Sequence, residues 1–125
     1  MDAFNHVNNT VYFRYFETAR LAHMTKIKVM EEMKLLNIGP ILASTECRFK
    51  APVKYPDDLL VGCRVTSIND FGFEHEYAVY SFHLDRVASF GKGTIVMVDY
   101  STGKKVPLND SIRQAILSSQ PDLLA

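Results

Sequence analysis

The residues best suited to chemistry stand at the front of the chain, in the segment 2–9. A carboxylate, an imidazole and several amide side chains are gathered there: Asp2, Asn5, His6, Asn8 and Asn9. The segment leads into an expected helix, whose first backbone N–H groups lack partners within the helix. These groups and the helix dipole could hold the oxyanion that forms when a carbonyl is attacked. Asp2 could act on the same carbonyl as a nucleophile or as the base that aligns a water.

The same residues also allow a simpler interpretation. Asp and Asn before a helix are common N-cap residues. An isolated histidine such as His6 more often has a structural hydrogen-bonding role than a catalytic one. The aromatic residues that follow, Tyr12 among them, fit a hydrophobic core as well as a substrate contact. The spacing by itself therefore leaves both capping and catalysis open.

The element that must position this segment is a helix from Asn9 to about Met24. Its apolar residues recur at helical spacing on one broad, aromatic face: Tyr12, Tyr15, Phe16, Ala19, Ala22 and His23. We expect this helix to pack against a wide surface, such as a sheet, along most of its length. A second, shorter helix is expected over 30–36, because Asn-Ile-Gly-Pro at 37–40 is a helix stop signal.

The apolar period changes after Pro40 from that of a helix to that of a strand. Strands are expected over four segments: 43–50, 59–68, 73–84 and 87–100. The first should have one face covered and the other wet or lining a groove. Gly91 and Gly93 indicate a bulge or a close approach of another group. A short helix entered at 107–110 completes an α+β arrangement with an antiparallel sheet.

Composition excludes several classes of function. The chain has 125 residues, with 14 basic and 14 acidic residues and a net charge of zero, and we expect one domain spanning 1–125. Such a balance argues against the basic stripe of a nucleic-acid-binding protein. There is no apolar run of about 20 residues that could span a bilayer and no secretory signal pattern. We therefore expect a cytoplasmic protein with no nucleic-acid or membrane partner.

Neither a disulfide nor a metal site is expected from the spacing of the remaining polar residues. Cys47 and Cys63 stand singly in apolar segments, where a small buried side chain is the commoner role. The neighbouring His and acidic residues do not reproduce a known metal-ligand spacing, so we expect no metal and no cofactor. Lys50, Arg86 and Lys92 could contact phosphates, although solvated surface charge is the simpler interpretation.

A family resemblance decides between these interpretations. Residues 2–12 (Asp-Ala-Phe-Asn-His-Val-Asn-Asn-Thr-Val-Tyr) and 15–20 (Tyr-Phe-Glu-Thr-Ala-Arg) closely resemble the signature of hotdog-fold acyl-CoA thioesterases, in the hydroxybenzoyl-CoA thioesterase-like family. Gly-Pro-Ile-Leu-Ala-Ser at 39–44, Tyr-Pro-Asp at 55–57 and Asp-Tyr-Ser-Thr-Gly at 99–103 resemble that family in the same order. The resemblance implies an antiparallel sheet wrapped around a long central helix, with active sites at a dimer interface.

The resemblance also implies roles for individual residues. Asp2 takes the place of the catalytic carboxylate, and the backbone N–H of Asn9 helps to hold the thioester oxygen. His6 and Asn8 organise the turn, and Asn8 and Tyr12 are expected to contact the substrate. The implied reaction is hydrolysis of an acyl-CoA to the free acid and CoA, by a homodimer or homotetramer. An acyl-carrier-protein thioesterase and a non-catalytic subunit that binds acyl thioesters are the alternatives.

Two positions depart from the family pattern. Asn5 stands where many members have Gly, a small change because Asn tolerates the left-handed conformation. The chain begins one residue before the motif aspartate, so the family's N-terminal strand is expected to be missing from the sheet, which would leave an edge unpaired. Asp2 would then lie beside a mobile amino terminus, which would loosen the geometry that catalysis requires. Either the sequence is a truncated version of a longer protein or the fold compensates, for example by pairing with another chain, and both alternatives stay open.

Overall fold

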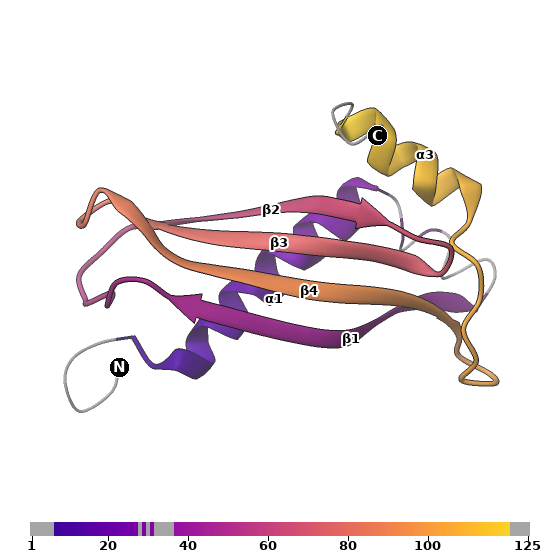
Figure 1. Ribbon diagram of the computed structural model, residues 1–125, viewed down its shortest axis with the longest axis horizontal. Helices are drawn as coiled ribbons and strands as arrows, with labels where there is room; N and C mark the ends of the chain where they lie inside the picture. Colours follow the sequence, from indigo (N-terminus) through magenta and orange to yellow (C-terminus); the bar gives the residue numbers. More distant parts are fainter. Residues whose placement is uncertain (1–6, 28, 30, 32–36, 121–125) are drawn as a thin grey trace.

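A computed structural model describes residues 7–27, 29, 31 and 37–120 of the protein. Its helices and strands follow one another in this order: α1 (Asn9–Lys26), β1 (Ile38–Phe49), β2 (Leu59–Ile68), β3 (Gly72–Ser81), β4 (Arg86–Asp99) and α3 (Asp110–Ser119). The strands form one antiparallel sheet in the order β1-β4-β3-β2 (Figure 1). The expected α+β arrangement, with a helix preceding four strands, is confirmed.

Two strand boundaries differ from those expected. β1 begins at Ile38 rather than near residue 43, because residues 38–42 already pair with β4. Pro40 is tolerated there because β1 lies at an edge of the sheet, where a missing N–H removes no ladder bond. β3 ends at Ser81 rather than near residue 84, and the His83 N–H beyond it donates to the Asp57 carboxylate at 3.0 Å. The helix expected over 30–36 lies largely outside the described residues.

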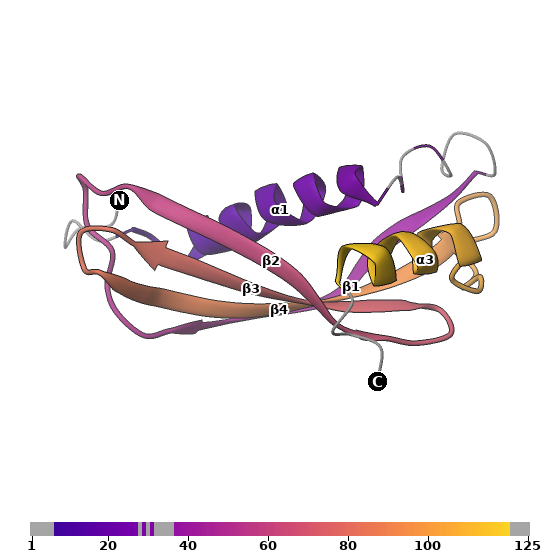
Figure 2. The same cartoon turned by 90° about the horizontal axis from the view of Figure 1, so that it is seen from above.

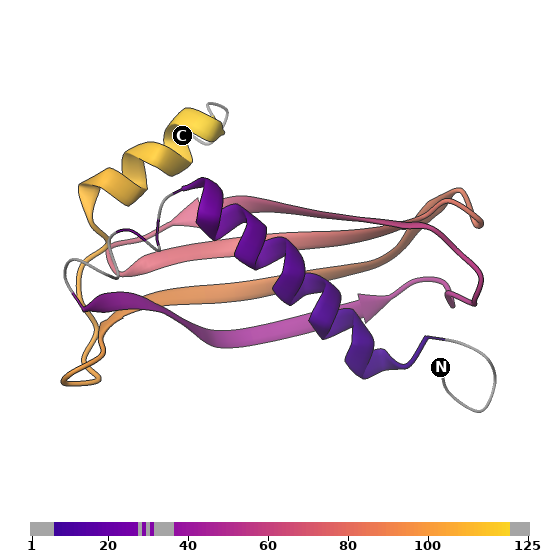
Figure 3. The same cartoon turned by 180° about the vertical axis from the view of Figure 1, so that it is seen from behind.

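α1 crosses one face of the sheet diagonally, from the end of β1 toward β2 (Figure 3). Its buried residues are Tyr12, Phe16 and Met24, and most of its contacts are with β2 and β3. Ala22, which was expected on the buried face, is exposed because that face runs through Phe16 and Met24 instead. The predicted packing against a sheet is confirmed.

β1 is less covered than its alternating pattern predicts. Residues 41–46 are exposed, so within the described chain neither face of this stretch is buried. The expectation that one face would be covered is wrong here, because the diagonal path of α1 brings the helix over β1 only near Phe49. The two rings of Tyr12 and Phe49 meet there edge to face, with centroids 5.1 Å apart.

The close approach expected at two glycines is confirmed. A Cβ atom at Gly91 would lie 2.3 Å from the ring of Phe16, and one at Gly93 would lie 2.7 Å from the hydroxyl oxygen of Tyr77. Phe16 and Tyr77 are themselves stacked, with ring centroids 4.9 Å apart. Both glycines therefore leave room for aromatic side chains beneath the sheet.

The core has two clusters of buried side chains. One lies under the first half of α1: Tyr12, Phe16, Val53, Tyr77, Val79 and Ala88. The other joins the far end of α1 to the sheet and to α3: Met24, Ile27, Val29, Val65, Phe73, Ile95, Met97, Leu108, Ile112 and Ile116. The helix is thus clamped to the sheet at both ends, which fixes the position of its N-terminus.

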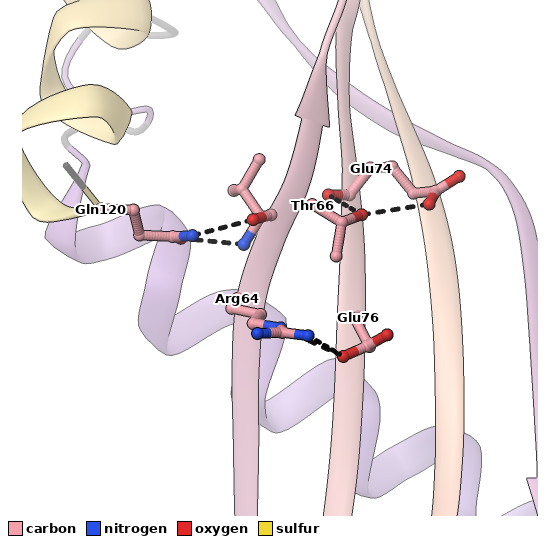
Figure 4. Close-up of polar contacts among 6 residues, drawn as sticks. Arg64, Thr66, Glu74, Glu76 and Gln120 are labelled. Atoms are coloured by element: carbon pink, nitrogen blue, oxygen red, sulfur yellow. Dashed lines mark hydrogen bonds and ion pairs between the residues drawn. The ribbon is translucent and has the colours of Figure 1, made fainter. Parts of the chain in front are cut away.

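α3 lies beside the edge strand β2 (Figure 2). The amide side chain of Gln120 accepts from the Val65 N–H and donates to the Val65 carbonyl, both at 2.8 Å (Figure 4). It therefore satisfies a backbone pair at the edge of β2. Arg64 and Glu76 form an exposed ion pair at 2.8 Å on neighbouring strands (Figure 4). No helix in the described part of the chain is long and apolar enough to cross a bilayer.

Candidate active site

The first turn of α1 is built by an asparagine cap. Asn8 has extended backbone angles (φ −63°, ψ 141°), and its side-chain oxygen accepts from the Thr10 N–H at 3.0 Å and from the Thr10 hydroxyl at 2.9 Å. Its carbonyl accepts from the Val11 N–H at 3.0 Å. Within the described residues the Asn9 N–H has no acceptor, so it is a backbone donor at the positive end of the helix.

The chain entering this turn is held in place. The Val7 N–H donates to the Val53 carbonyl at 2.8 Å, and Val7 packs against the core cluster beneath the first half of α1. This anchoring fixes the direction in which the first turn of the helix faces.

A pocket of about 540 Å³ opens at the helix start. One wall comes from the first turn of α1 and the other from the end of β1 and the loop after it: Val7, Asn8, Asn9, Tyr12, Phe49, Lys50, Ala51 and Pro52. Lys50 is the charged member of this described lining, and no carboxylate is among it. The pocket thus combines a helix N-terminus, an aromatic wall and a cation, which suits a ligand that has a polar carbonyl and negative charge.

Tyr12 supplies the buried aromatic wall of the pocket. Its side chain is 3% exposed, and its ring is edge to face with Tyr15 at 5.8 Å. Burial raises the pKa of the Tyr12 phenol, and a contact with the backbone of Val53 partly opposes the rise. Tyr12 therefore stays neutral at physiological pH and belongs to the core and the pocket at once.

The structure brings together part of the predicted site. Asn8, Asn9 and Tyr12 all line the pocket, and Asn8 is the N-cap residue of α1. Asp2 and His6 lie outside the described residues, so their roles stay predictions.

Lys50, Arg86 and Lys92, the three cations considered as phosphate contacts, lie at different places. Lys50 lines the pocket at the helix start and, with Lys92, a second hollow of about 330 Å³. Lys92 pairs across the sheet with Glu46 and Glu76, which line the same hollow. Arg86 lies exposed at the start of β4. Lys50 is therefore the cation best placed for a ligand at the helix start.

A second polar group lies buried between α1 and the sheet, and the sequence analysis did not find it. His75 Nε2 lies 2.9 Å from His23 Nδ1, His75 Nδ1 lies 3.1 Å from the Tyr77 hydroxyl, and Arg20 donates to that hydroxyl at 3.3 Å. The ligand atoms of His23, Cys63 and His75 all lie within 4.8 Å of one another. Helical spacing placed His23 on the buried face, but nothing in the sequence gave the register that sets Cys63 beside His75.

Burial sets the protonation of this group. It lowers the pKa of His75 to about 3, with the His23 and Arg20 charges adding to the shift, and it lowers the pKa of His23, with a smaller contribution from Lys26. It raises the pKa of Cys63 to about 12, against a small opposing effect of Arg20. Both imidazoles and the thiol are therefore neutral at physiological pH.

Comparisons with known proteins show that the chain is similar to members of the thioesterase-like superfamily. A family model of the thioesterase-like superfamily matches residues 1–116. The uncharacterized protein YsmA of Bacillus subtilis (strain 168) is 26% identical over 121 residues, which cover 95% of this chain and 79% of that protein.

Solved structures agree on the fold. A thioesterase of Thermus thermophilus, complexed with coenzyme A and zinc, has a TM-score of 0.82 at 26% identity, over 97% of this chain and 86% of that one. The DHNA-CoA thioesterase of Staphylococcus aureus has a TM-score of 0.83 at 18% identity, over 97% of this chain and 83% of that one. These similarities confirm the hotdog fold.

Proposed function

Because this chain belongs to the thioesterase-like superfamily, we propose that it hydrolyses the thioester bond of an acyl-CoA to give a free acid and CoA. The Thermus thermophilus relative is a thioesterase that was solved with coenzyme A. A CoA thioester also matches the polarity of the pocket, which places a cation near the helix start and an aromatic wall behind it.

The observation that carries the proposal is the backbone N–H of Asn9, a residue that lines the pocket and whose N–H has no acceptor within the described residues. Attack on a thioester carbonyl moves negative charge onto the carbonyl oxygen, and a fixed donor at that place stabilises the transition state. The helix dipole adds to this effect without any rearrangement during the reaction. The N–H groups of Thr10 and Val11 already donate to Asn8, so the Asn9 N–H is the donor that remains for the substrate.

The remaining parts of the proposed site combine the lining of the pocket with the roles that the family resemblance implies. Tyr12 and Phe49 form the wall against which the acyl group packs, and Lys50 provides positive charge for the CoA phosphates. As a nucleophile, Asp2 attacks the carbonyl carbon to form an acyl-enzyme anhydride, which water then hydrolyses to the free acid and the regenerated carboxylate. As a base, Asp2 takes a proton from the water that attacks the carbonyl carbon. His6 organises the turn between Asp2 and the helix. In either route the C–S bond breaks and CoA leaves as the thiol.

We further propose that the protein works as a homodimer or homotetramer. β1 lies at an edge of the sheet, and the side chains of Ile41 and Leu42 on it are 44% and 40% exposed. An edge strand with exposed apolar side chains is a surface that a second chain would cover. Sedimentation velocity measures the assembly directly, and a monomer at assay concentrations would contradict this proposal.

A thiol-release assay tests the function. The full chain is given short, medium, long-chain and aromatic acyl-CoAs, alongside Asp2→Asn and the matched acid-to-amide control Glu17→Gln, which alters an exposed residue on α1. We expect turnover of at least one substrate, a large loss in Asp2→Asn and no loss in Glu17→Gln. Affinity without turnover would instead identify a binding subunit. Full turnover by Asp2→Asn would contradict the role of Asp2 and leave the hydrolysis standing.

A further inference from the structure

The buried group at the far end of α1 has the composition of a metal site. It contains two imidazoles and one thiol, from three different elements: His23 on α1, Cys63 on β2 and His75 on β3. Their ligand atoms lie within 4.8 Å of one another. The register of β2 and β3 explains the meeting, because Cys63 pairs with Tyr77 and Val65 pairs with His75.

We propose that His23, Cys63 and His75 bind one divalent metal ion of the zinc type, at a site separate from the pocket at the helix start. Imidazole and thiolate are the ligands that such an ion prefers, whereas Mg²⁺ and Ca²⁺ require oxygen ligands. Three protein ligands leave a fourth position for water. The proposal does not depend on the proposed thioesterase activity.

The distances suit an ion after a small adjustment. Tetrahedral zinc, with bonds of about 2.0 Å to nitrogen and about 2.3 Å to sulfur, separates its ligand atoms by about 3.3–3.6 Å. The two imidazole nitrogens now lie 2.9 Å apart, so they must separate by a few tenths of an ångström. The Cys63 sulfur now lies within 4.8 Å of both nitrogens, and it must lie about 3.6 Å from each of them when the ion is bound.

The surroundings of His75 orient its ring toward the cluster. The Tyr77 hydroxyl lies 3.1 Å from His75 Nδ1 and receives a hydrogen bond from Arg20. With His75 Nδ1 held by the hydroxyl, Nε2 faces His23 and can act as the ligand atom. A metal-binding histidine almost always has its second nitrogen held by such an outer partner.

One ring nitrogen of His23 has no hydrogen-bond partner within the described residues. This nitrogen, Nε2, is buried, although the Nδ1 atom of the same ring contacts His75. A buried unpaired nitrogen is costly. When His23 Nδ1 binds the ion, Nε2 carries the ring proton and needs an outer acceptor such as a water. The imidazole pair is therefore not a complete hydrogen-bonded network by itself.

Charge and access are compatible with a cation. Both imidazoles are neutral, as ligation requires. An ion displaces the proton from the Cys63 thiol, so that one proton is released on binding. The resulting thiolate offsets one of the two positive charges of the metal. Arg20 and Lys26 are the positive groups nearby, and their charge weakens the attraction of the site for a cation. His23 and Cys63 are half-buried, and Cys63 lies on the edge strand β2, which gives the ion a route inward.

The test uses tag-free full-length protein stripped with a chelator. Co²⁺ is titrated to detect a thiolate-to-cobalt charge-transfer band in the near ultraviolet, and Zn²⁺ is added to measure the shift in melting temperature. The variants are Cys63→Ser and His23→Asn, at half-buried positions where the fold tolerates substitution better than at His75. Cys47→Ser and His83→Asn are the matched controls, because Cys47 and His83 lie outside the cluster.

We expect one metal per chain, a thiolate band and a higher melting temperature with Zn²⁺ in the wild type and in both controls. Cys63→Ser should lose the band. In both cluster variants, the melting temperature with Zn²⁺ should lie close to the melting temperature of the same variant without metal. The proposal is overturned if saturating Zn²⁺ leaves the melting temperature unchanged, if Co²⁺ gives no thiolate band, or if the cluster variants bind as the controls do.

Discussion

A proline at position 9 tests the oxyanion donor with little other change to the molecule. Asn9 is the first residue of α1, where proline is favoured because its missing N–H would have no partner in the helix anyway. Asn8 already has the extended backbone, with ψ at 141°, that a following proline requires. Asn9→Pro should therefore fold normally and remove the one backbone donor that the proposed mechanism uses.

The expected loss follows from that single hydrogen bond. Removing one oxyanion donor lowers kcat by about 10²–10³-fold, which corresponds to about 2.7–4 kcal/mol of transition-state stabilisation. KM should change little, because the donor binds the developing oxyanion more strongly than the ground-state carbonyl. The stability of the fold should change by no more than about 0.5 kcal/mol, as for other exposed positions.

The assay is thiol release on the best acyl-CoA substrate, with urea denaturation run in parallel. Asn9→Ala is the matched control, since it removes the same side chain and keeps the N–H. The mechanism requires a low kcat in Asn9→Pro and a nearly normal one in Asn9→Ala. If the two variants turn over substrate at the same rate, the Asn9 amide does not hold the oxyanion.

Three further predictions concern the scaffold. Gly91→Ala should destabilise the fold by about 1–3 kcal/mol in urea denaturation, because the new Cβ would lie 2.3 Å from an aromatic ring of α1. Gly62→Ala is the control and should be nearly neutral in the same measurement, because nothing lies within 4 Å of the added atom. Gln120→Ala should lower the unfolding free energy by about 1–3 kcal/mol, because a backbone pair on β2 loses both partners. Arg64→Ala should cost less than about 1 kcal/mol, because its ion pair is exposed; equal losses in these two variants would refute the comparison. The unfolded chain takes up the His75 proton at a higher pH than the folded one, since burial lowers the pKa from 6.5 to about 3. Stability is therefore fully present above pH 6.5 and falls by up to about 1.4 kcal/mol per pH unit as the pH drops toward 3. His75→Gln should reduce that slope in chelator-treated protein, and an unchanged slope would show that His75 does not titrate as described.

The sequence predicts those parts of the fold that depend on local periodicity. The start of α1 at Asn9 and the limits of β2 agree with the structure, because a cap residue and turn residues mark these boundaries. The burial of β1 was not predictable in this way. An alternating pattern shows which residues share a face, but the crossing angle of α1 decides whether that face is covered.

Long-range pairing explains what was missed at the polar cluster. His23, Cys63 and His75 are far apart in sequence, so no short metal-ligand spacing motif connects them. They meet because the register of two strands and the path of the helix bring them together. By contrast, Asn8, Asn9 and Tyr12 are close in sequence and form one helical turn, so their common position at the pocket could be predicted.

The most direct test of the central claim is a crystal structure with an acyl-CoA analogue in which a methylene group replaces the thioester sulfur and the carbonyl is kept. The account predicts the carbonyl oxygen at about 2.7–3.1 Å from the Asn9 backbone nitrogen, with the acyl group against Tyr12. An analogue bound with its carbonyl away from the start of α1 would contradict the proposed active site.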